Sequence, residues 1–373
     1  MKQSLTHNEL EALLNDPAAT PLDKGWHIYR HLSTYMAHPL TSTEARTLLL
    51  TYMQLPLEHP SLLHSLMLGL ALKMADVYPD FKLPAFLHLW DISNLRPEDM
   101  QRQQGADGKV HSSLMERLTR TTLRYQTKHP SEPIDPDVLS RMAPETERMG
   151  FLPIKPMVAI KMFESVKEGR KMRFVKLVGQ EGEELSADWH LFHAKPWEIV
   201  GQMYSVLARR SAESGTLRAD TIGPATQRVE EVFPQRIGFV EAYDESHRHY
   251  HVFDSESRHF VAEAPKVRPV VGGYVWFCPI VPAVDKFKSA IVLRREAAEA
   301  GRQAFGLTAA KVTHINTEKQ YFAYQTADGS KGFANSSLLP ALAAVGMEVD
   351  LIIYLRRGKD GEKRPHVAEC LPR

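Results

Sequence analysis

The chain has 373 residues, of which 43% are hydrophobic and 24% are charged, a composition typical of folded globular proteins. Its formal net charge is only +1, which excludes a protein that is basic throughout, so any surface that attracts phosphates must be local. At roughly 100–200 residues per domain, this length predicts two to four domains.

The sequence carries no sign of a secreted or membrane protein. No apolar run reaches the ~18–20 residues of a membrane-spanning helix. The polar stretch Met1–Asp16 lacks the basic start and apolar core of a secretory signal. The two cysteines, Cys278 and Cys370, are too few to form a metal cluster by themselves. We therefore expect a cytoplasmic protein with free thiols and no membrane contact.

Residues 1–150 are predicted to form a helical domain, because apolar side chains recur at helical spacing between prolines that separate the segments. Paired short helices of this kind resemble a tetratricopeptide-like or other helical-repeat stack. That resemblance implies a surface that recruits a protein partner. The expected helices include Asp23–Ala37, Thr43–Gln54, Ser61–Tyr78 and Leu114–Gln126.

Residues 151–230 are predicted to form a connecting domain that mixes helices with a hairpin. Arg173–Val178 alternates as a strand, and Glu184–Phe192 is expected to return beside it after a turn. The other expected elements are helices at Met157–Glu168 and Trp197–Glu213 and a linker at Gly215–Thr226.

A local excess of positive charge lies in this connecting domain. From Lys155 to Lys176 the chain has seven Lys or Arg residues against two glutamates, Glu164 and Glu168. One interpretation is a solvated charged face, and the other is a surface that faces phosphates. The sequence leaves both open.

From Ile237 onward the pattern changes to short strands, and residues 236–295 and 306–373 follow one plan. Each stretch has two strands around a polar turn, a short third strand, then a glycine, an apolar fourth strand and a last strand. Five short strands with glycines at the corners predict a small Greek-key barrel of the OB type. Arg295–Gln303 is expected to join the two barrels as a helix or linker. The predicted fold class is multidomain α+β: a helical domain, a mixed α/β block and two five-stranded β-barrels.

The last stretch has Asn316 and Lys319 in its first turn, aromatic residues in the strand that follows, and Phe333 in the next strand, and with these residues it resembles a cold-shock domain. The family's usual histidine in the second ribonucleoprotein motif is Asn335 here, and the glycines of the first motif are absent. The matching positions are Asn316 and Lys319 in the first turn, Tyr321, Phe322 and Tyr324 in the first motif, Phe333 in the second motif, and residues 346–353 in the fourth strand.

Residues 236–295 resemble the same family more loosely. Residues 238–244 correspond to its first strand. His249, Tyr250 and His251 stand in the first motif and Phe260 in the second. Nine basic and nine acidic residues balance between positions 236 and 300, whereas ten basic face seven acidic residues between 301 and 373. The last barrel is therefore the better candidate for nucleic acid, with weak, salt-sensitive binding.

The resemblance implies aromatic rings on which unpaired bases stack, beside cations that hold the phosphates. Because strand side chains alternate, Phe322 and Tyr324 share one face and Tyr321 takes the other. We expect Phe322, Tyr324 and Phe333 to face outward; the reverse parity, and a role for all these rings in the core, are the alternatives. The candidate contacts are Lys319, Tyr321, Phe322, Tyr324, Lys331, Phe333, Arg356 and Arg357 in the last barrel and His249, Tyr250, His251 and Phe260 in the first.

Motifs of known active sites are absent from the sequence, including phosphate-binding glycine loops, dinucleotide fingerprints and the metalloprotease pair of histidines. His247, His249 and His251 alternate before and along a strand, but no carboxylate ligand is evident on a second strand. A surface or stacking role is expected for them, and no metal. Cys278 lies in an apolar strand and is expected in the core. We expect no cofactor.

The leading hypothesis is a non-catalytic accessory protein that binds single-stranded RNA or DNA. The alternative is a protein-interaction scaffold whose barrels have lost nucleic-acid binding, which the near-neutral charge and relaxed motifs favour. A third possibility is an enzyme with an unrecognised site in residues 150–230.

Overall fold

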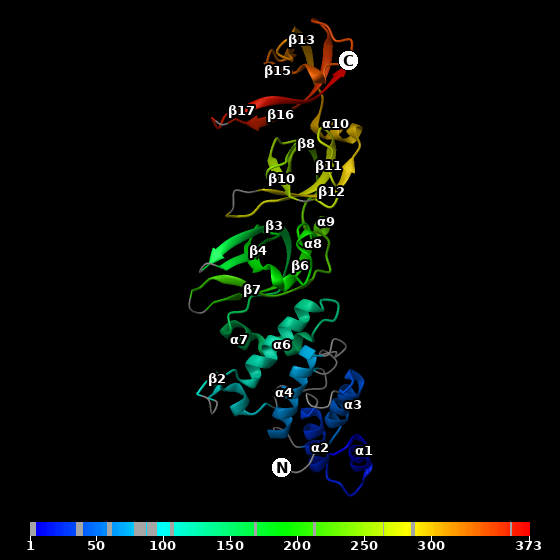
Figure 1. The fold of residues 1–373 in the computed structure, drawn as a ribbon, viewed down its shortest axis with the longest axis vertical. Helices are drawn as coiled ribbons and strands as arrows, with labels where there is room; N and C mark the ends of the chain where they lie inside the picture. Colours follow the sequence, from blue (N-terminus) through cyan, green and yellow to red (C-terminus); the bar gives the residue numbers. More distant parts are fainter. Residues whose placement is uncertain are drawn as a thin grey trace. The chain divides into compact units, whose positions relative to one another are not determined.

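The computed structural model describes residues 5–34, 40–57, 62–77, 87, 95–104, 108–167, 170–211, 214–263, 265–284, 288–358 and 360–373. Within these ranges the chain combines helices with three five-stranded β-sheets (Figure 1). Contacts divide it into two compact units: Met1–Ile154 with Ser205–Thr226, and Lys155–Tyr204 with Gln227–Arg373. The division into four domains stays a prediction.

The first unit is mainly helical, as predicted. Its helices begin at side chains that accept a hydrogen bond from the first turn, among them Thr20, Thr41 and Ser113. None of the described helices combines the length and apolar character that spanning a membrane requires. The helical-repeat arrangement stays a prediction. The elements are α1 (His7–Asn15), α2 (Pro21–Ser33), α3 (Ser42–Met53), α4 (Leu62–Val77), η2 (Pro97–Met100), β1 (Gln103–Gln104), β2 (Val110–His111), α6 (Leu114–Lys128) and α7 (Pro136–Arg148).

A buried carboxylate, Glu116, ties the start of α6 to two other segments. It accepts hydrogen bonds from Arg102 at 2.6 Å, from Arg148 at 2.5 Å and from the Ser113 backbone amide at 2.9 Å. Burial by itself would raise the pKa of Glu116, but these hydrogen bonds together lower it. The charged form is therefore the one that the fold stabilises.

We predict that Glu116→Gln lowers the free energy of unfolding of the chain by about 1–2 kcal/mol, because charge-assisted hydrogen bonds are lost. Since the pKa is lowered in the folded state, this stability is present above pH ~4.5 and is lost as pH falls below it. Denaturant unfolding at pH 7 and pH 3 measures both effects. The exposed Glu98→Gln is the control, and an equal loss in the control contradicts the assignment.

The block after the helical region is a β-sheet, and the helices predicted at Met157–Glu168 and Trp197–Glu213 are wrong. The first of these segments pairs with β4 from Met157 to Lys167, interrupted by one bulge between Ala159 and Lys161. Gly215–Thr226, predicted as a linker, is largely a strand. The predicted hairpin is confirmed, because Phe174–Val178 pairs with Glu184–Asp188. The elements are β3 (Lys155–Lys167), β4 (Arg170–Gly179), β5 (Glu184–Asp188), η3 (Trp189–Phe192), α8 (Pro196–Ile199), β6 (Met203–Arg210), β7 (Leu217–Pro224) and α9 (Val229–Val232).

Residues 236–296 form the closed five-stranded barrel that the sequence predicts. Its hydrogen-bonded order is β10-β12-β11-β8-β9, closed by the parallel pairing of Val261 with Ser289. Val240, Val252, Phe260 and Phe277 fill its interior. The strands are β8 (Arg236–Asp244), β9 (His249–Asp254), β10 (His259–Glu263), β11 (Tyr274–Ile280) and β12 (Ser289–Glu296), followed by helix α10 (Ala298–Phe305).

The last five strands were expected to close a second barrel, but in the described residues they form an open sheet with the order β15-β14-β13-β16-β17. The edge strands β15 and β17 instead line a common cavity. The elements are β13 (Thr308–Asn316), β14 (Tyr321–Thr326), β15 (Lys331–Asn335), η4 (Ser336–Leu338), β16 (Glu348–Arg357) and β17 (Lys363–Pro372).

All three sheets share one strand order and one irregularity. In each, the first strand lies between the second and the fourth, the third strand lies beside the second, and the fifth lies beside the fourth. In the closed barrel the third and fifth strands also pair with each other. The first strand carries a β-bulge against the second at the same place in each sheet, between Ala159 and Lys161, between Val240 and Ala242, and between Val312 and His314. The connecting block is therefore a third copy of the same sheet plan.

The closed barrel and the last sheet are joined by a buried contact within the second unit. Phe239 and Phe253 of the barrel pack against Tyr354 of β16. The Tyr354 hydroxyl donates to Glu241 at 2.7 Å, and Arg356 donates to the same oxygen at 2.9 Å. The contact covers part of the outer side of β8 and β9.

Candidate nucleic-acid interface

The outer side of the last sheet presents side chains from three adjacent strands, which we call the β13–β15 face. Directly paired residues of neighbouring strands project to the same side, so the register defines rows of side chains across the face. The three rows are Asn316, Tyr321 and Asn335; His314, Ala323 and Phe333; and Lys311, Gln325 and Lys331.

The parity expected for β14 is wrong, and the reverse parity holds. Phe322 is 0% exposed and Tyr324 is 2% exposed, so both belong to the core, while Tyr321 faces outward. Gly332 of β15 lies opposite Tyr324, and a Cβ at position 332 would come within 2.3 Å of the tyrosine hydroxyl. The missing side chain makes room for the inward ring of Tyr324.

Three rings gather on the β13–β15 face. Phe333 is 67% exposed and meets the half-buried ring of Tyr321 edge to face, with centroids 5.7 Å apart. The His314 ring lies 6.0 Å from that of Tyr321. Beside them is a cavity of about 390 Å³, within the range of ~300–1,000 Å³ that small-ligand pockets span. Its lining residues are Tyr321, Phe333, Ala334, Asn335, Leu338, His366 and Val367.

Cations border these rings. Lys311 and Lys331 lie on either side of Gln325 in the row next to Phe333, and both are exposed. Lys319 is exposed in the turn that precedes Tyr321, where its backbone amide donates to Asn316 at 2.8 Å. These lysines form no ion pair with a carboxylate in the described part of the chain. Their charge is thus available to phosphates beside the rings.

The two predicted arginines have other surroundings. Arg356 is held by Glu241 of the closed barrel, so its charge is partly neutralised. Arg357 is exposed near the end of β16. Neither residue lines the cavity beside Tyr321 and Phe333.

On the closed barrel, one predicted contact is excluded by burial. Phe260 is 1% exposed and packs against Phe277 in the barrel core, because it lies opposite the inward-facing Val252. Tyr250 is also turned toward that core. His249 and His251 face outward on β9. This outer side therefore has histidines in place of exposed aromatic rings.

The register also identifies an aromatic pair that the sequence analysis missed. Phe174 of β4 lies opposite Asp188 as Tyr321 lies opposite Asn335, and both Asp188 and Asn335 cap the short helix that follows their strand. Phe163 of β3 stacks on Phe174, with centroids 5.7 Å apart and planes 27° apart. Both rings are half-buried. The prediction of a helix at 157–168 concealed this pair.

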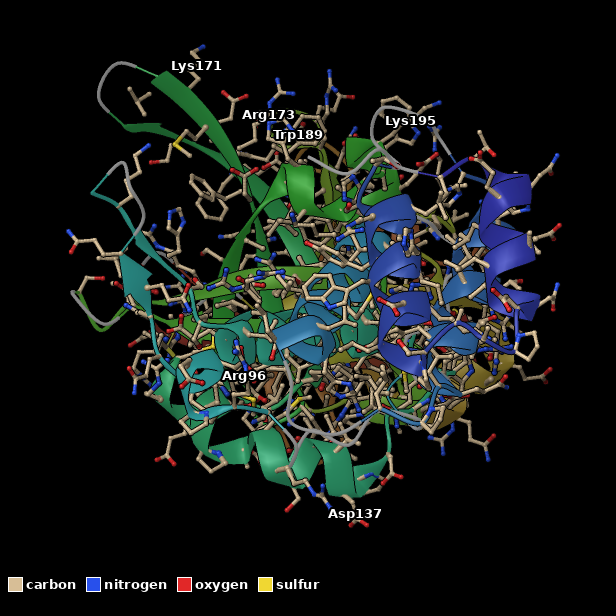
Figure 2. All side chains as sticks on the ribbon, turned by 90° about the horizontal axis from the view of Figure 1, so that it is seen from below. Arg96, Asp137, Lys171, Arg173, Trp189 and Lys195 are labelled. Atoms are coloured by element: carbon tan, nitrogen blue, oxygen red, sulfur yellow. The ribbon has the colours of Figure 1, made fainter. Side chains whose placement is uncertain are left out.

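Lysines accompany this pair as well. Lys161 and Lys176 form the next row of the outer side, which we call the β3–β5 face. Lys176 is paired with Glu184. Figure 2 shows Lys171 and Arg173 projecting from the β3–β4 hairpin, and Arg173 pairs with Glu164 at 3.0 Å. Much of the basic run is thus neutralised by glutamates, which weakens its pull on phosphates.

Comparisons with known proteins identify no family for this chain. No family model matches the chain, and no curated protein matches it. Among solved structures it is similar to a Drosophila fragment described as "Unr CSD456", with 10% sequence identity and a TM-score of 0.20. The match covers 60% of this chain and 98% of that one. A TM-score this low carries no argument about fold or function.

The assignment of faces predicts a large loss of stability when Phe322 is removed and almost none when Phe333 is removed. Phe322→Ala removes a fully buried ring and should lower the free energy of unfolding by about 3–5 kcal/mol. Phe333→Ala removes an exposed ring and should change it by less than about 0.5 kcal/mol. Urea denaturation of the full chain measures both. Equal losses in the two variants would contradict the observed parity.

Proposed function

We propose that this chain is a non-catalytic accessory protein that binds single-stranded RNA or DNA through the β13–β15 face. The supporting observation is the exposed ring of Phe333 beside Tyr321, bordered by Lys311 and Lys331. Aromatic faces accept any unpaired base, and lysines accept any phosphate, so such a face binds strands with little sequence preference. We also propose that the protein is cytoplasmic, where RNA is the commonest single-stranded nucleic acid.

The β3–β5 face supports a second contact for the same strand. The Phe163–Phe174 stack stands at the register position of Asn316 and Tyr321, and Lys161 and Lys176 adjoin it. Its rings are more covered than Phe333 and one of its lysines is ion-paired. We therefore assign the β3–β5 face a smaller share of the affinity for the nucleic acid. For the helical unit we propose a different role, the binding of a protein partner.

The proposal predicts that Phe333→Ala weakens binding of a fluorescein-labelled single-stranded oligonucleotide to the full chain. Loss of one stacked base, worth about 1–3 kcal/mol, lowers the affinity roughly 5- to 150-fold. Phe174→Ala should weaken it less. Leu342→Ala is the matched control and should bind normally, because this side chain is 92% exposed and does not line the cavity beside the rings. Fluorescence anisotropy at low salt gives the affinities.

The lysines predict a separate effect on salt dependence. Replacing Lys311 and Lys331 together by Gln should reduce the slope of log affinity against log salt by about 1.4, at ~0.7 per lost phosphate contact on a single strand. Absence of binding at low salt, or affinities indifferent to both Phe333 and these lysines, would overturn the proposal. Capture of a protein partner by the same chain would then favour an interaction scaffold.

A further inference from the structure

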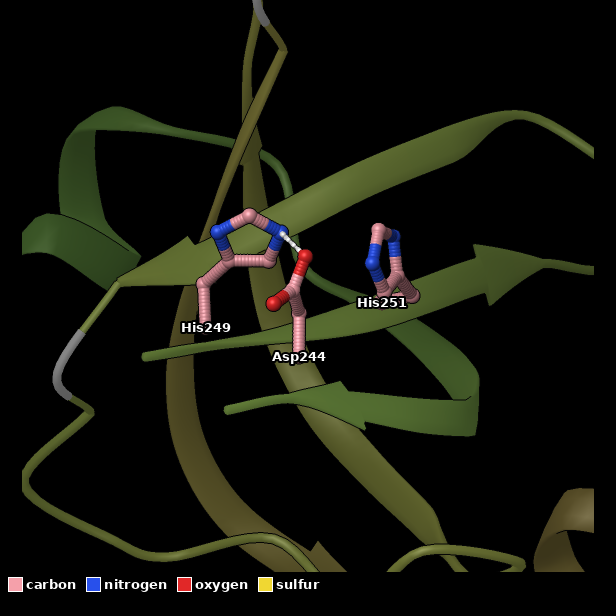
Figure 3. A group of neighbouring side chains, drawn as sticks. All are labelled: Asp244, His249 and His251. Atoms are coloured by element: carbon pink, nitrogen blue, oxygen red, sulfur yellow. Dashed lines mark ion pairs between the residues drawn. The ribbon is translucent and has the colours of Figure 1, made fainter. Parts of the chain in front are cut away.

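The outer side of β8 and β9 gathers histidines and a carboxylate around one point. Ligand atoms of Asp244, His249 and His251 all lie within 4.8 Å of one another. Figure 3 shows the Asp244 carboxylate between the two imidazole rings, with Oδ2 3.9 Å from Nε2 of His249. The three residues are half-buried, which leaves room for an ion to enter from solvent.

Two more histidines surround this cluster. A ring hydrogen bond of 2.8 Å joins Nδ1 of His251 to Nε2 of His259 on β10. Metal-binding histidines are commonly oriented by such a bond at the nitrogen that does not bind the metal. His247 lies on the open side, with Nδ1 2.9 Å from Oδ2 of Asp244. It is mostly exposed, so it can turn toward the same point as a further ligand.

The turn between β8 and β9 does not by itself require a charged residue at position 244. Oδ1 of Asp244 accepts hydrogen bonds from the backbone amides of Ser246 and His247. In the last sheet the equivalent position is Asn316, whose Oδ1 does the same for the Lys319 amide. A neutral amide therefore suffices for this turn. The second oxygen of Asp244 adds a negative charge, and it lies 2.9 Å from Nδ1 of His247 and 3.9 Å from Nε2 of His249.

From this geometry we infer that Asp244, His249 and His251 form a binding site for a divalent transition-metal ion of the Zn²⁺ type. Imidazole and carboxylate donors are the ligands that Zn²⁺ accepts, and three protein ligands with an open fourth position are common. His259 acts as the outer partner of His251. Bonds of ~2.0–2.1 Å need the donor atoms closer together than they now lie, so metal binding requires these half-buried side chains to rotate toward one another.

The sequence pattern alone argued against a metal, because its histidines had no carboxylate beside them. The hairpin register supplies one, since Asp244 is paired directly with His249. The inference is independent of nucleic-acid binding by the other two faces.

The test is a calorimetric titration of the full chain with Zn²⁺ at pH 7.5, after a chelator has removed bound metals. We expect one site per chain, with affinity at least tenfold lower in His249→Ala, His251→Ala and Asp244→Asn. The last variant keeps the turn, because asparagine serves at position 316. His190→Ala, an exposed histidine elsewhere in the same unit, is the control and should bind Zn²⁺ normally.

A second readout separates a lost site from a lost fold. Visible absorption of Co²⁺ bound in place of Zn²⁺ should appear in the parent chain and disappear in Asp244→Asn, while the circular dichroism of the metal-free proteins stays the same. Failure to bind one equivalent of Zn²⁺, or binding that all three variants retain, overturns the inference. Binding lost equally in His190→Ala also overturns it.

Discussion

The β-bulge in the first strand of each sheet decides which side chains of that strand face outward beyond the bulge. An extra residue in one strand shifts the alternation of inward and outward side chains beyond it. In the last sheet, the pairing passes from Val312 opposite Tyr324 to His314 opposite Ala323. His314 thereby joins Tyr321 and Phe333 on the outer side while Val312 stays in the core. In the closed barrel the same shift brings Asp244 to the outer side, opposite His249.

The same outer position carries different chemistry in the three sheets. The third pair beyond the bulge is Phe163 and Phe174 in one sheet, Asp244 and His249 in the next, and Asn316 and Tyr321 in the last. The backbone plan is constant, and the side chains on it differ, as expected when function resides in sites placed on a common fold. Aromatic rings suit bases, whereas histidines with a carboxylate suit a metal ion.

Much of the fold was predictable from local patterns, but the parity of the faces was not. Helices α2, α3, α4 and α6 and the strands of the closed barrel were recognised because their apolar spacing is regular. The strand β3 was mistaken for a helix because Met157–Ile160 are buried in succession, which conceals the alternation of a strand. The outward side of β14 stayed open because the strand carries aromatic rings on both sides, with Tyr321 on one and Phe322 and Tyr324 on the other. Asp244 was missed because only the register brings it to His249.

The proposed function requires unpaired bases to lie against the outward rings of the last sheet. The most direct test is photocrosslinking of the full chain to a single-stranded oligonucleotide that carries 4-thiouridine, with the crosslinked peptides mapped by mass spectrometry. We predict crosslinks at Tyr321 and Phe333, with a weaker set at Phe163 and Phe174. Crosslinks confined to the helical unit would contradict binding at these rings. So would crosslinking of the single strand that is no stronger than that of a double-stranded probe with the same label.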